Sequence, residues 1–160
     1  MVLFKLSMMK KISKNISYKE ATGSNYAKRY GIKNKPSEEQ VDNMQLLAKE
    51  VFEPLREWVD APIKVNSMFR SLELNSALKG SKTSSHLKGE AMDITSMGGK
   101  SNLEMFHYIK DNLCFDQLIW EFGNEPKWLH VSYKKEDNRQ QILVTKRPGI
   151  YHTYSNCKSC

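Results

Sequence analysis

The sequence has few cysteines and lacks long apolar runs. Its 160 residues include three cysteines, too few for the disulfide framework of a small secreted scaffold. No stretch approaches the ~20 consecutive apolar residues that a membrane-spanning helix needs. The apolar run at residues 1–4 is also too short for the hydrophobic segment of a signal peptide. We therefore expect neither a membrane span nor export by the standard route.

Glycine and proline are scarce as well, at 8 and 5 residues, and no repeat or flexible linker divides the chain. This length suits one compact domain, so we expect a single domain over residues 1–160. Residues 1–14 and 147–160 are expected to be peripheral or flexible. Cys157 and Cys160 form a terminal C-x-x-C without a second pair, which favours a solvated tail over half of a zinc site. Cys114, at an apolar helix end, is expected to be buried.

Basic residues outnumber acidic ones, 25 to 18, which gives a formal net charge of +7. Such a surface is attracted to nucleic acids, anionic membranes and acidic wall polymers, and charge alone does not select among them. The lysines are dispersed, and neither an aromatic RNA-binding motif nor a recognition helix stands out. We therefore expect no nucleic-acid partner.

Helix starts are marked by capping boxes, in which a Ser is followed three residues later by Glu or Gln. They occur at Ser17, Ser37 and Ser101. Apolar residues recur at helical spacing after the second and third of these starts, which predicts two amphipathic helices with buried stripes. The first stripe comprises Val41, Met44, Leu47, Val51, Leu55 and Trp58, and the second comprises Leu103, Phe106, Ile109 and Leu113.

Strands are predicted where apolar and polar residues alternate or where β-branched and aromatic residues gather. The segments 117–122 and 128–133 flank a turn of composition Gly-Asn-Glu-Pro-Lys and predict a hairpin. Helices come first and a mainly antiparallel sheet follows, so the expected class is α+β. The other expected strands span 63–69, 91–95 and 141–145.

The sequence contains four histidines, and their settings differ. His107 lies off the apolar stripe of its helix and His152 lies in the polar tail, so both are interpreted as surface residues. His86 lies in a Ser/Lys/Gly-rich loop before a strand with Asp93, and His130 lies within another strand. Two imidazoles and one carboxylate can bind zinc and leave a position for water. From spacing alone, structural roles remain the favoured interpretation and zinc binding the alternative.

The pattern Ser84-x-His86-x-x-Gly89-x-Ala91-x-Asp93, followed by Trp128-x-His130, resembles the signature of the M15 peptidases. These are zinc D-Ala-D-Ala carboxypeptidases and L-alanyl-D-glutamate endopeptidases of bacteria and their phages. The resemblance covers residues 15–135, including the strand-then-Arg-Ser segment at 63–71 and the Gly-Ile-x-Asn-x-Pro stretch at 31–36. It implies a small antiparallel sheet backed by helices, the hedgehog/DD-peptidase-like form of the α+β class.

The resemblance also implies roles for individual residues. His86, Asp93 and His130 would bind Zn2+. Arg70 would pair with a substrate carboxylate or stabilise the oxyanion, although an exposed, salt-bridged arginine is its other interpretation. Ser84 would order the loop before His86 and help to bind substrate.

The general base is not given by the resemblance, because many members have a carboxylate three residues before the last histidine and this chain has Lys127 there. Glu121 and Glu125 are the candidates. In the expected hairpin, burial of the apolar face places Glu121 on the same face as His130, since side chains alternate along a strand. We therefore expect Glu121 to be the base and Glu125 to be a solvated turn residue. Ser132 is expected to face solvent beside the site.

The implied reaction is hydrolysis of an amide bond in a peptidoglycan stem peptide by zinc-activated water. The favoured interpretation is a monomeric endolysin of the phage type, made in the bacterial cytoplasm without a signal peptide and active at the cell wall after release. A D-Ala-D-Ala carboxypeptidase is the alternative. A non-catalytic, zinc-stabilised wall-binding module is a third hypothesis, and it predicts no carboxylate base beside the metal.

Overall fold

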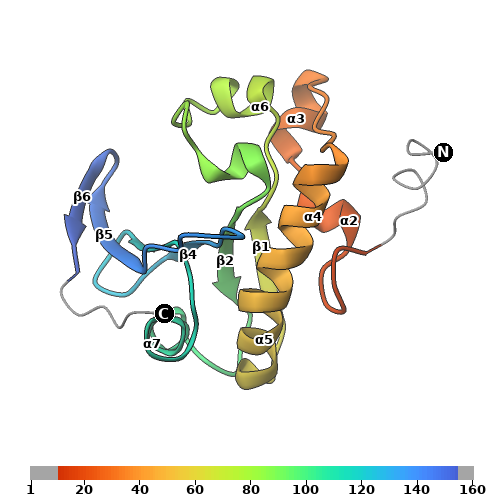
Figure 1. Cartoon of the computed structure of the whole chain (residues 1–160). Helices are drawn as coiled ribbons and strands as arrows, with labels where there is room; N and C mark the ends of the chain where they lie inside the picture. Colours follow the sequence, from red (N-terminus) through yellow and green to blue (C-terminus); the bar gives the residue numbers. More distant parts are fainter. Residues whose placement is uncertain (1–10, 155–160) are drawn as a thin grey trace.

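A six-stranded sheet with the order β1-β2-β4-β3-β5-β6 organises the computed structural model, which describes residues 11–154 (Figure 1). Neighbouring strands are antiparallel except for the parallel pair β3 and β5. The expected α+β class is therefore confirmed. The strands are β1 (Ile63–Ser67), β2 (Ala91–Ser96), β3 (Gln117–Glu121), β4 (Trp128–Ser132), β5 (Gln141–Arg147) and β6 (Ile150–Thr153).

Helices precede the sheet and connect its strands. The α-helices are α2 (Tyr18–Thr22), α3 (Asn25–Tyr30), α4 (Glu38–Leu47), α5 (Glu53–Val59), α6 (Leu72–Ala77) and α7 (Asn102–Asn112). A π-helical turn, η1 (Ala48–Phe52), joins α4 to α5, and a 3-10 turn, η2 (Ser85–Lys88), precedes β2. None of the helices within residues 11–154 is long and apolar enough to cross a membrane.

The expected long helix is present, but it is not regular throughout. Ser37 and Gln40 form the predicted capping box at its start, and the apolar stripe from Val41 to Leu55 is at most 2% exposed. The π-helical turn ends at Phe52, two residues before Pro54. Proline has no N–H to donate to the preceding turn and its ring crowds that turn, so a widened turn accommodates it.

Helix α7 begins at the predicted Ser101 capping box. Phe106 and Ile109 are fully buried as expected, while Leu113 is only partly buried. The expectation that Cys114 is buried was wrong, because the helix ends at Asn112 and the chain then turns Cys114 outward. Cys157 and Cys160 lie outside the described residues.

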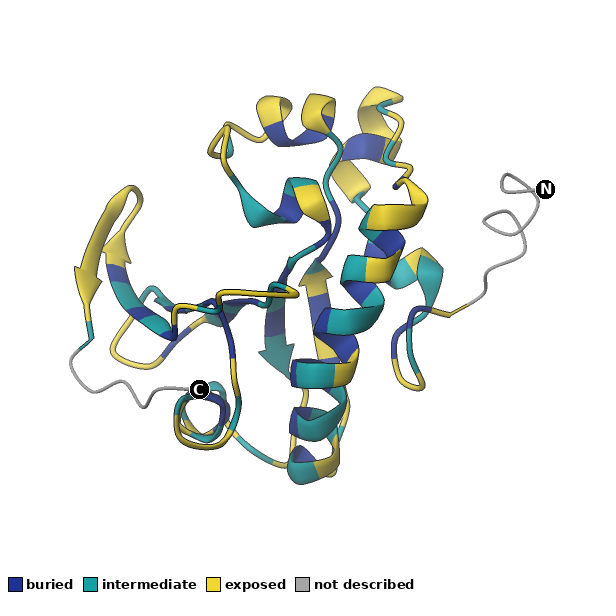
Figure 2. Ribbon diagram, viewed as in Figure 1, coloured by how far each residue is buried: buried dark blue, intermediate teal, exposed yellow. Residues whose placement is uncertain are grey.

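The two faces of the sheet have different environments. Met92, Ile94, Leu129 and Val131 point into the core, where residues of α4, α5 and α7 pack against them. Figure 1 shows α7 on one side of the sheet and the segment with α6 and η2 on the other, and Figure 2 shows the buried residues between sheet and helices. The face opposite the core is therefore available for a site.

The predicted hairpin is confirmed, and its register determines which side chains share that second face. Gln117 pairs with Ser132, Ile119 with His130 and Glu121 with Trp128. On the other side of β4, His130 pairs with Asp93 of β2. Residues that pair directly have side chains on the same face of a sheet, so Asp93, His130 and Glu121 lie on one face.

Beyond β4, the described chain ends in a hairpin. Strands β5 and β6 are antiparallel, with a register shift between Thr145 and Arg147, and all four residues of β6 are exposed. This hairpin extends from the body of the protein in Figure 1. It includes residues 147–154 of the segment expected to be peripheral or flexible.

Candidate active site

The turn η2 positions the His86 side chain. The Ser84 hydroxyl accepts a hydrogen bond from the His86 N–H at 3.3 Å, and Gly89 ends the turn with a φ of +71°. A side chain at Gly89 would collide with the Gln40 carbonyl, so both the backbone angle and the close packing require glycine. The His86 ring is 3% exposed, and its Nδ1 lies 2.6 Å from the Met68 carbonyl oxygen. That contact leaves Nε2 directed toward the site.

Asp93 lies between the two histidines. One carboxylate oxygen, Oδ2, is 3.3 Å from Nε2 of His86, and the other, Oδ1, is 2.9 Å from Nδ1 of His130. Burial by itself would raise the pKa of Asp93, but the adjacent His86 and the hydrogen bonds from both imidazoles outweigh it and hold the pKa far below its ordinary value of 3.8. Asp93 is therefore an ionised carboxylate over the whole physiological range.

This group fits a zinc ion. Zinc binds His nitrogen and carboxylate oxygen at about 2.0–2.2 Å, so donor atoms around a tetrahedral ion lie about 3.3 Å apart. The donor atoms of His86, Asp93 and His130 all lie within 4.8 Å of one another, and the part of the chain that the structure describes contains no other such group. The contact between His86 and a backbone carbonyl is the usual orienting support for a metal-binding histidine.

Arg70 lies directly beside the group. Its Nη2 donates to Asp93 Oδ2 at 3.0 Å and its Nε donates to Ser67 Oγ at 2.9 Å. Its backbone N–H donates to the His86 carbonyl at 3.1 Å, and its side chain is 19% exposed. Arg70 is therefore a fixed, mostly buried cation in the site rather than a surface residue.

Asn34 holds the backbone on both sides of Arg70. Its side-chain amide donates to the carbonyls of Thr22 and Phe69, at 2.8 and 3.1 Å, and its carbonyl accepts from the Ser71 N–H at 2.7 Å. Asn34 belongs to the Gly-Ile-x-Asn-x-Pro stretch that carried part of the resemblance. The sequence could single out this stretch, but it gave no sign that its asparagine positions Arg70.

Of the two base candidates, only Glu121 lies at the site. It lines a cavity of about 830 Å3 together with His86, Asp93 and His130. Burial chiefly raises the pKa of Glu121; the charge of Asp93 adds to this and His130 partly opposes it. Glu125 is exposed in the turn between β3 and β4 and does not line the cavity. The role of Glu121 as a base remains a prediction.

The expectation for Ser132 was wrong. Ser132 is 1% exposed, and its hydroxyl accepts a hydrogen bond from the Gln117 N–H at 3.1 Å. The reason is that β4 lies between β2 and β3, so strands cover it on both sides. Ser84 lines the cavity, whereas His107 and His152 are exposed and stand apart from the metal group, as expected.

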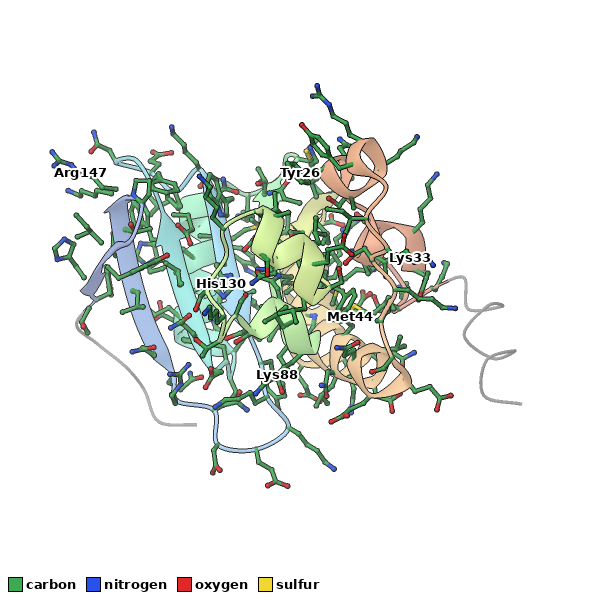
Figure 3. The ribbon with its side chains drawn as sticks, turned by 90° about the horizontal axis from the view of Figure 1, so that it is seen from above. Tyr26, Lys33, Met44, Lys88, His130 and Arg147 are labelled. Atoms are coloured by element: carbon green, nitrogen blue, oxygen red, sulfur yellow. The ribbon has the colours of Figure 1, made fainter. Side chains whose placement is uncertain are left out.

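Sequence patterns did not identify Tyr151 of β6, which also lines this cavity. Tyr151 pairs with Thr145 of β5, and Thr145 pairs in parallel with Glu121. Burial, and then the negative charges of Glu121 and Asp93, raise the pKa of Tyr151. A short strand in a polar tail carries no signal of this placement. Figure 3 labels His130 at the strands of the sheet and Met44 among the helices beside them.

Comparison with known proteins gives one family. None of the curated proteins compared with the chain matches it. A family model described as Peptidase M15 matches residues 14–132, which include Arg70, Glu121 and the entire His86–Asp93–His130 group. The small, mostly antiparallel sheet backed by helices is the hedgehog/DD-peptidase-like fold that the resemblance implied. The chain therefore belongs to the peptidase M15 family.

Proposed function

We propose that this chain is a zinc-dependent peptidase that hydrolyses an amide bond within the peptide stems of peptidoglycan. The proposed place of action is the cell wall, where that polymer lies, and the proposed type is an endolysin. One observation carries the proposal. Two imidazoles and a carboxylate converge on the open face of the sheet, in the same cavity as the Glu121 carboxyl.

In this proposal His86, Asp93 and His130 hold the zinc ion. Zinc bound there would polarise the scissile carbonyl and lower the pKa of water. The ionised state of Asp93 suits this role, because its pKa is held far below 3.8. With zinc bound, the Met68 carbonyl would keep the remaining proton of His86 on Nδ1, since a carbonyl oxygen can only accept, and Nε2 would be left for the metal.

Glu121 is proposed to move the proton. Its carboxylate would accept a proton from the attacking water and transfer it to the amide nitrogen as the carbon–nitrogen bond breaks. The raised pKa of Glu121 suits a group that must both accept and release a proton. Glu121 and His130 are diagonal neighbours across β3 and β4, about 7–8 Å apart at the backbone, which leaves room for substrate between the side chains.

Arg70 is proposed to bind the carbonyl oxygen or a substrate carboxylate. Its guanidinium is held by Ser67 and by the Asn34-supported backbone, so little freedom is lost when it donates to substrate. Ser84, at the edge of the cavity, is proposed to contact the peptide as well as order the His86 turn.

Two alternatives are separated by structural features. A non-catalytic wall-binding module needs no carboxylate beside the metal group, so Glu121 in the same cavity favours catalysis. A D-Ala-D-Ala carboxypeptidase must bind a terminal carboxylate, and the cation Lys79 in the cavity lining could do so. The carboxypeptidase is therefore the second candidate.

Digestion of purified sacculi tests the proposal. Sacculi would be incubated with the wild-type protein, with and without a chelator, and with the Glu121→Gln variant, and the released peptides would be identified by mass. We expect cleavage within the stem that the chelator abolishes. Release of D-Ala alone would support the carboxypeptidase, and no release by zinc-loaded protein would refute the proposal.

A further inference from the structure

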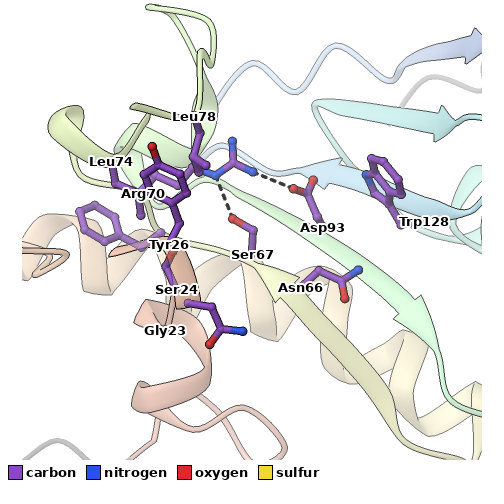
Figure 4. Close-up of a pocket in the computed structure, with 12 residues that line it drawn as sticks. Gly23, Ser24, Tyr26, Asn66, Ser67, Arg70, Leu74, Leu78, Asp93 and Trp128 are labelled. Atoms are coloured by element: carbon purple, nitrogen blue, oxygen red, sulfur yellow. Dashed lines mark hydrogen bonds and ion pairs between the residues drawn. The ribbon is translucent and has the colours of Figure 1, made fainter. Parts of the chain in front are cut away.

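A second cavity adjoins the metal group on the side of β1. It has a volume of about 560 Å3 and lies between the α2–α3 turn, the end of β1 and helix α6 (Figure 4). We call it the α3–α6 pocket and define it by Tyr26, Asn66, Phe69, Leu74 and Leu78 of its lining. Its volume falls within the ~300–1,000 Å3 typical of ligand pockets.

The α3–α6 pocket and the larger cavity meet at the candidate site. Arg70, Asp93 and Trp128 line both. Figure 4 shows Arg70 paired with Asp93, with Leu74 and Leu78 toward one side of this pair and Trp128 toward the other. A peptide whose reacting amide lies at Asp93 could therefore extend into both cavities.

The two cavities differ in charge. In the α3–α6 pocket the charged lining residues are Arg70 and Asp93, which are paired with each other at 3.0 Å. The larger cavity is lined in addition by Lys79, Arg139 and Glu121. The α3–α6 pocket therefore suits an uncharged group, because a charged one would lose hydration without gaining an opposite charge.

Two apolar side chains of the lining are partly open to solvent and can contact a ligand that enters the pocket. Tyr26 is 37% exposed and Leu78 is 41% exposed. Tyr26 is also held in place: its ring lies 4.5 Å from that of Tyr30, and Ser24 caps the helix that carries both. A side chain that is already ordered loses little entropy on binding.

We propose that the α3–α6 pocket is a substrate subsite for an uncharged, apolar residue of the peptide that is cleaved at the metal group. This inference rests on the proposed peptidase function. It adds that the substrate extends to both sides of the scissile bond and that Tyr26 and Leu78 select the residue on the uncharged side.

Matched synthetic peptides test the subsite. A short capped peptide spanning the scissile bond would be compared with peptides extended by Leu, Glu or Lys at the amino side or the carboxyl side. For the wild-type protein, Leu on one of the two sides should raise kcat/KM about tenfold over the short peptide, and Glu or Lys should raise it less. The responsive side identifies the end of the substrate that enters the pocket.

Variants then assign the preference to the pocket. Leu78→Lys should reverse the preference, so that on the responsive side the Glu-extended peptide has a higher kcat/KM than the Leu-extended one. Tyr26→Ala should remove most of the increase in kcat/KM that Leu gives, mainly by raising KM. The readout is the ratio of extended to short peptide, so that any general loss of activity cancels. Leu72→Lys is the matched control, because Leu72 begins helix α6, which Leu78 directly follows, is 68% exposed and does not line the pocket. The ratios of this variant should equal those of the wild type.

The failures of the two proposals are distinguishable. If the wild-type protein cleaves the short peptide but neither extension changes kcat/KM, or if both pocket variants keep the wild-type ratios, the subsite is refuted and the peptidase function stands. If no peptide is cleaved, the proposed endopeptidase function fails. The dissociation constants of the same peptides, measured by calorimetry, then decide the subsite, and values unchanged by Tyr26→Ala and Leu78→Lys would overturn it.

Discussion

Replacing Glu121 with glutamine probes the proposed chemistry most directly. Glutamine has nearly the size of glutamate and can still form hydrogen bonds, but its amide cannot accept a proton from water. Glu121 lies on β3 with its side chain on the face that carries Asp93 and His130. The variant should therefore preserve the fold and the metal group while it removes proton transfer.

The expected loss of rate follows from the removal of the base, and the expected effect on stability follows from the burial of Glu121. Loss of a general base usually lowers the rate by about 10²- to 10⁴-fold, which corresponds to about 3–5 kcal/mol of transition-state stabilisation. The free energy of unfolding of the variant should be equal to or higher than that of the wild type. Burial raises the pKa of Glu121, so its ionised form is disfavoured in the folded state and a neutral amide costs no stability there.

The assay combines kcat on a defined stem peptide, zinc content by metal analysis and the thermal midpoint. Glu125→Gln is the matched control, because it makes the same chemical change at an exposed turn residue outside the cavity. Glu121→Gln should retain one zinc and at least the wild-type thermal midpoint. An active Glu121→Gln protein together with an inactive Glu125→Gln protein would refute the assignment.

The pH profile provides an independent check on the same residue. A general base must be deprotonated in the free enzyme, so kcat/KM should fall as the pH drops through the pKa of Glu121. Because burial raises that pKa, the acid limb should lie above the ordinary glutamate value of 4.5. An acid limb at or below that value would contradict the assignment.

Three further predictions concern the rest of the site and the fold. Arg70→Ala should lose most activity while its zinc content stays near that of the wild type. Arg70→Lys should recover little activity, because one ammonium cannot reproduce the planar guanidinium that contacts both Ser67 and Asp93. Normal turnover in either variant would show that Arg70 is dispensable. His130→Ala should lose the bound zinc in metal analysis, and a full equivalent held with unchanged affinity would show that the ligand set is wrong. Asp116→Asn should lower the free energy of unfolding by about 2–3 kcal/mol in urea titrations at pH 7, since Asp116 is 2% exposed and accepts hydrogen bonds from Arg139 at 2.6 and 2.8 Å. Burial alone would raise the pKa of Asp116, but those bonds lower it below 3.8. The stabilisation is therefore present above the pKa of the unfolded state and should be lost as the pH falls through the lower pKa of the folded state. A urea midpoint at pH 7 that Asp116→Asn leaves unchanged would refute this prediction.

Local features of the sequence determined much of the fold. The capping boxes at Ser37 and Ser101 located the starts of two helices, and alternation of side chains predicted the β3–β4 hairpin. These signals operate over a few residues, because a cap bonds within one helical turn and a strand alternates with a period of two. The same alternation predicts Glu121 on the face of His130 from the sequence of the hairpin alone, and the observed register agrees.

Chemistry-bearing residue types were also visible in the sequence, but their convergence was not. Spacing alone indicates structural roles for His86, Asp93 and His130. The prediction that they bind zinc comes from the resemblance to the M15 family. Their meeting depends on the pairing of β2 with β4 and on the η2 turn. Such long-range pairing leaves no periodic trace in one sequence, so only the structure shows the donor atoms within 4.8 Å.

Tertiary structure alone decided the surroundings of the site. The parallel pairing of β3 with β5 brings Tyr151 to the cavity, and the position of β4 inside the sheet buries Ser132. The side chain of Asn34 forms hydrogen bonds with the backbone of Phe69 and Ser71, on either side of Arg70. The sequence by itself determined which residues can do chemistry and which short segments form helices and strands, because those properties are local. The cavities, their charges and the supports of Arg70 arise from contacts between distant segments, which only the packing of the whole chain specifies.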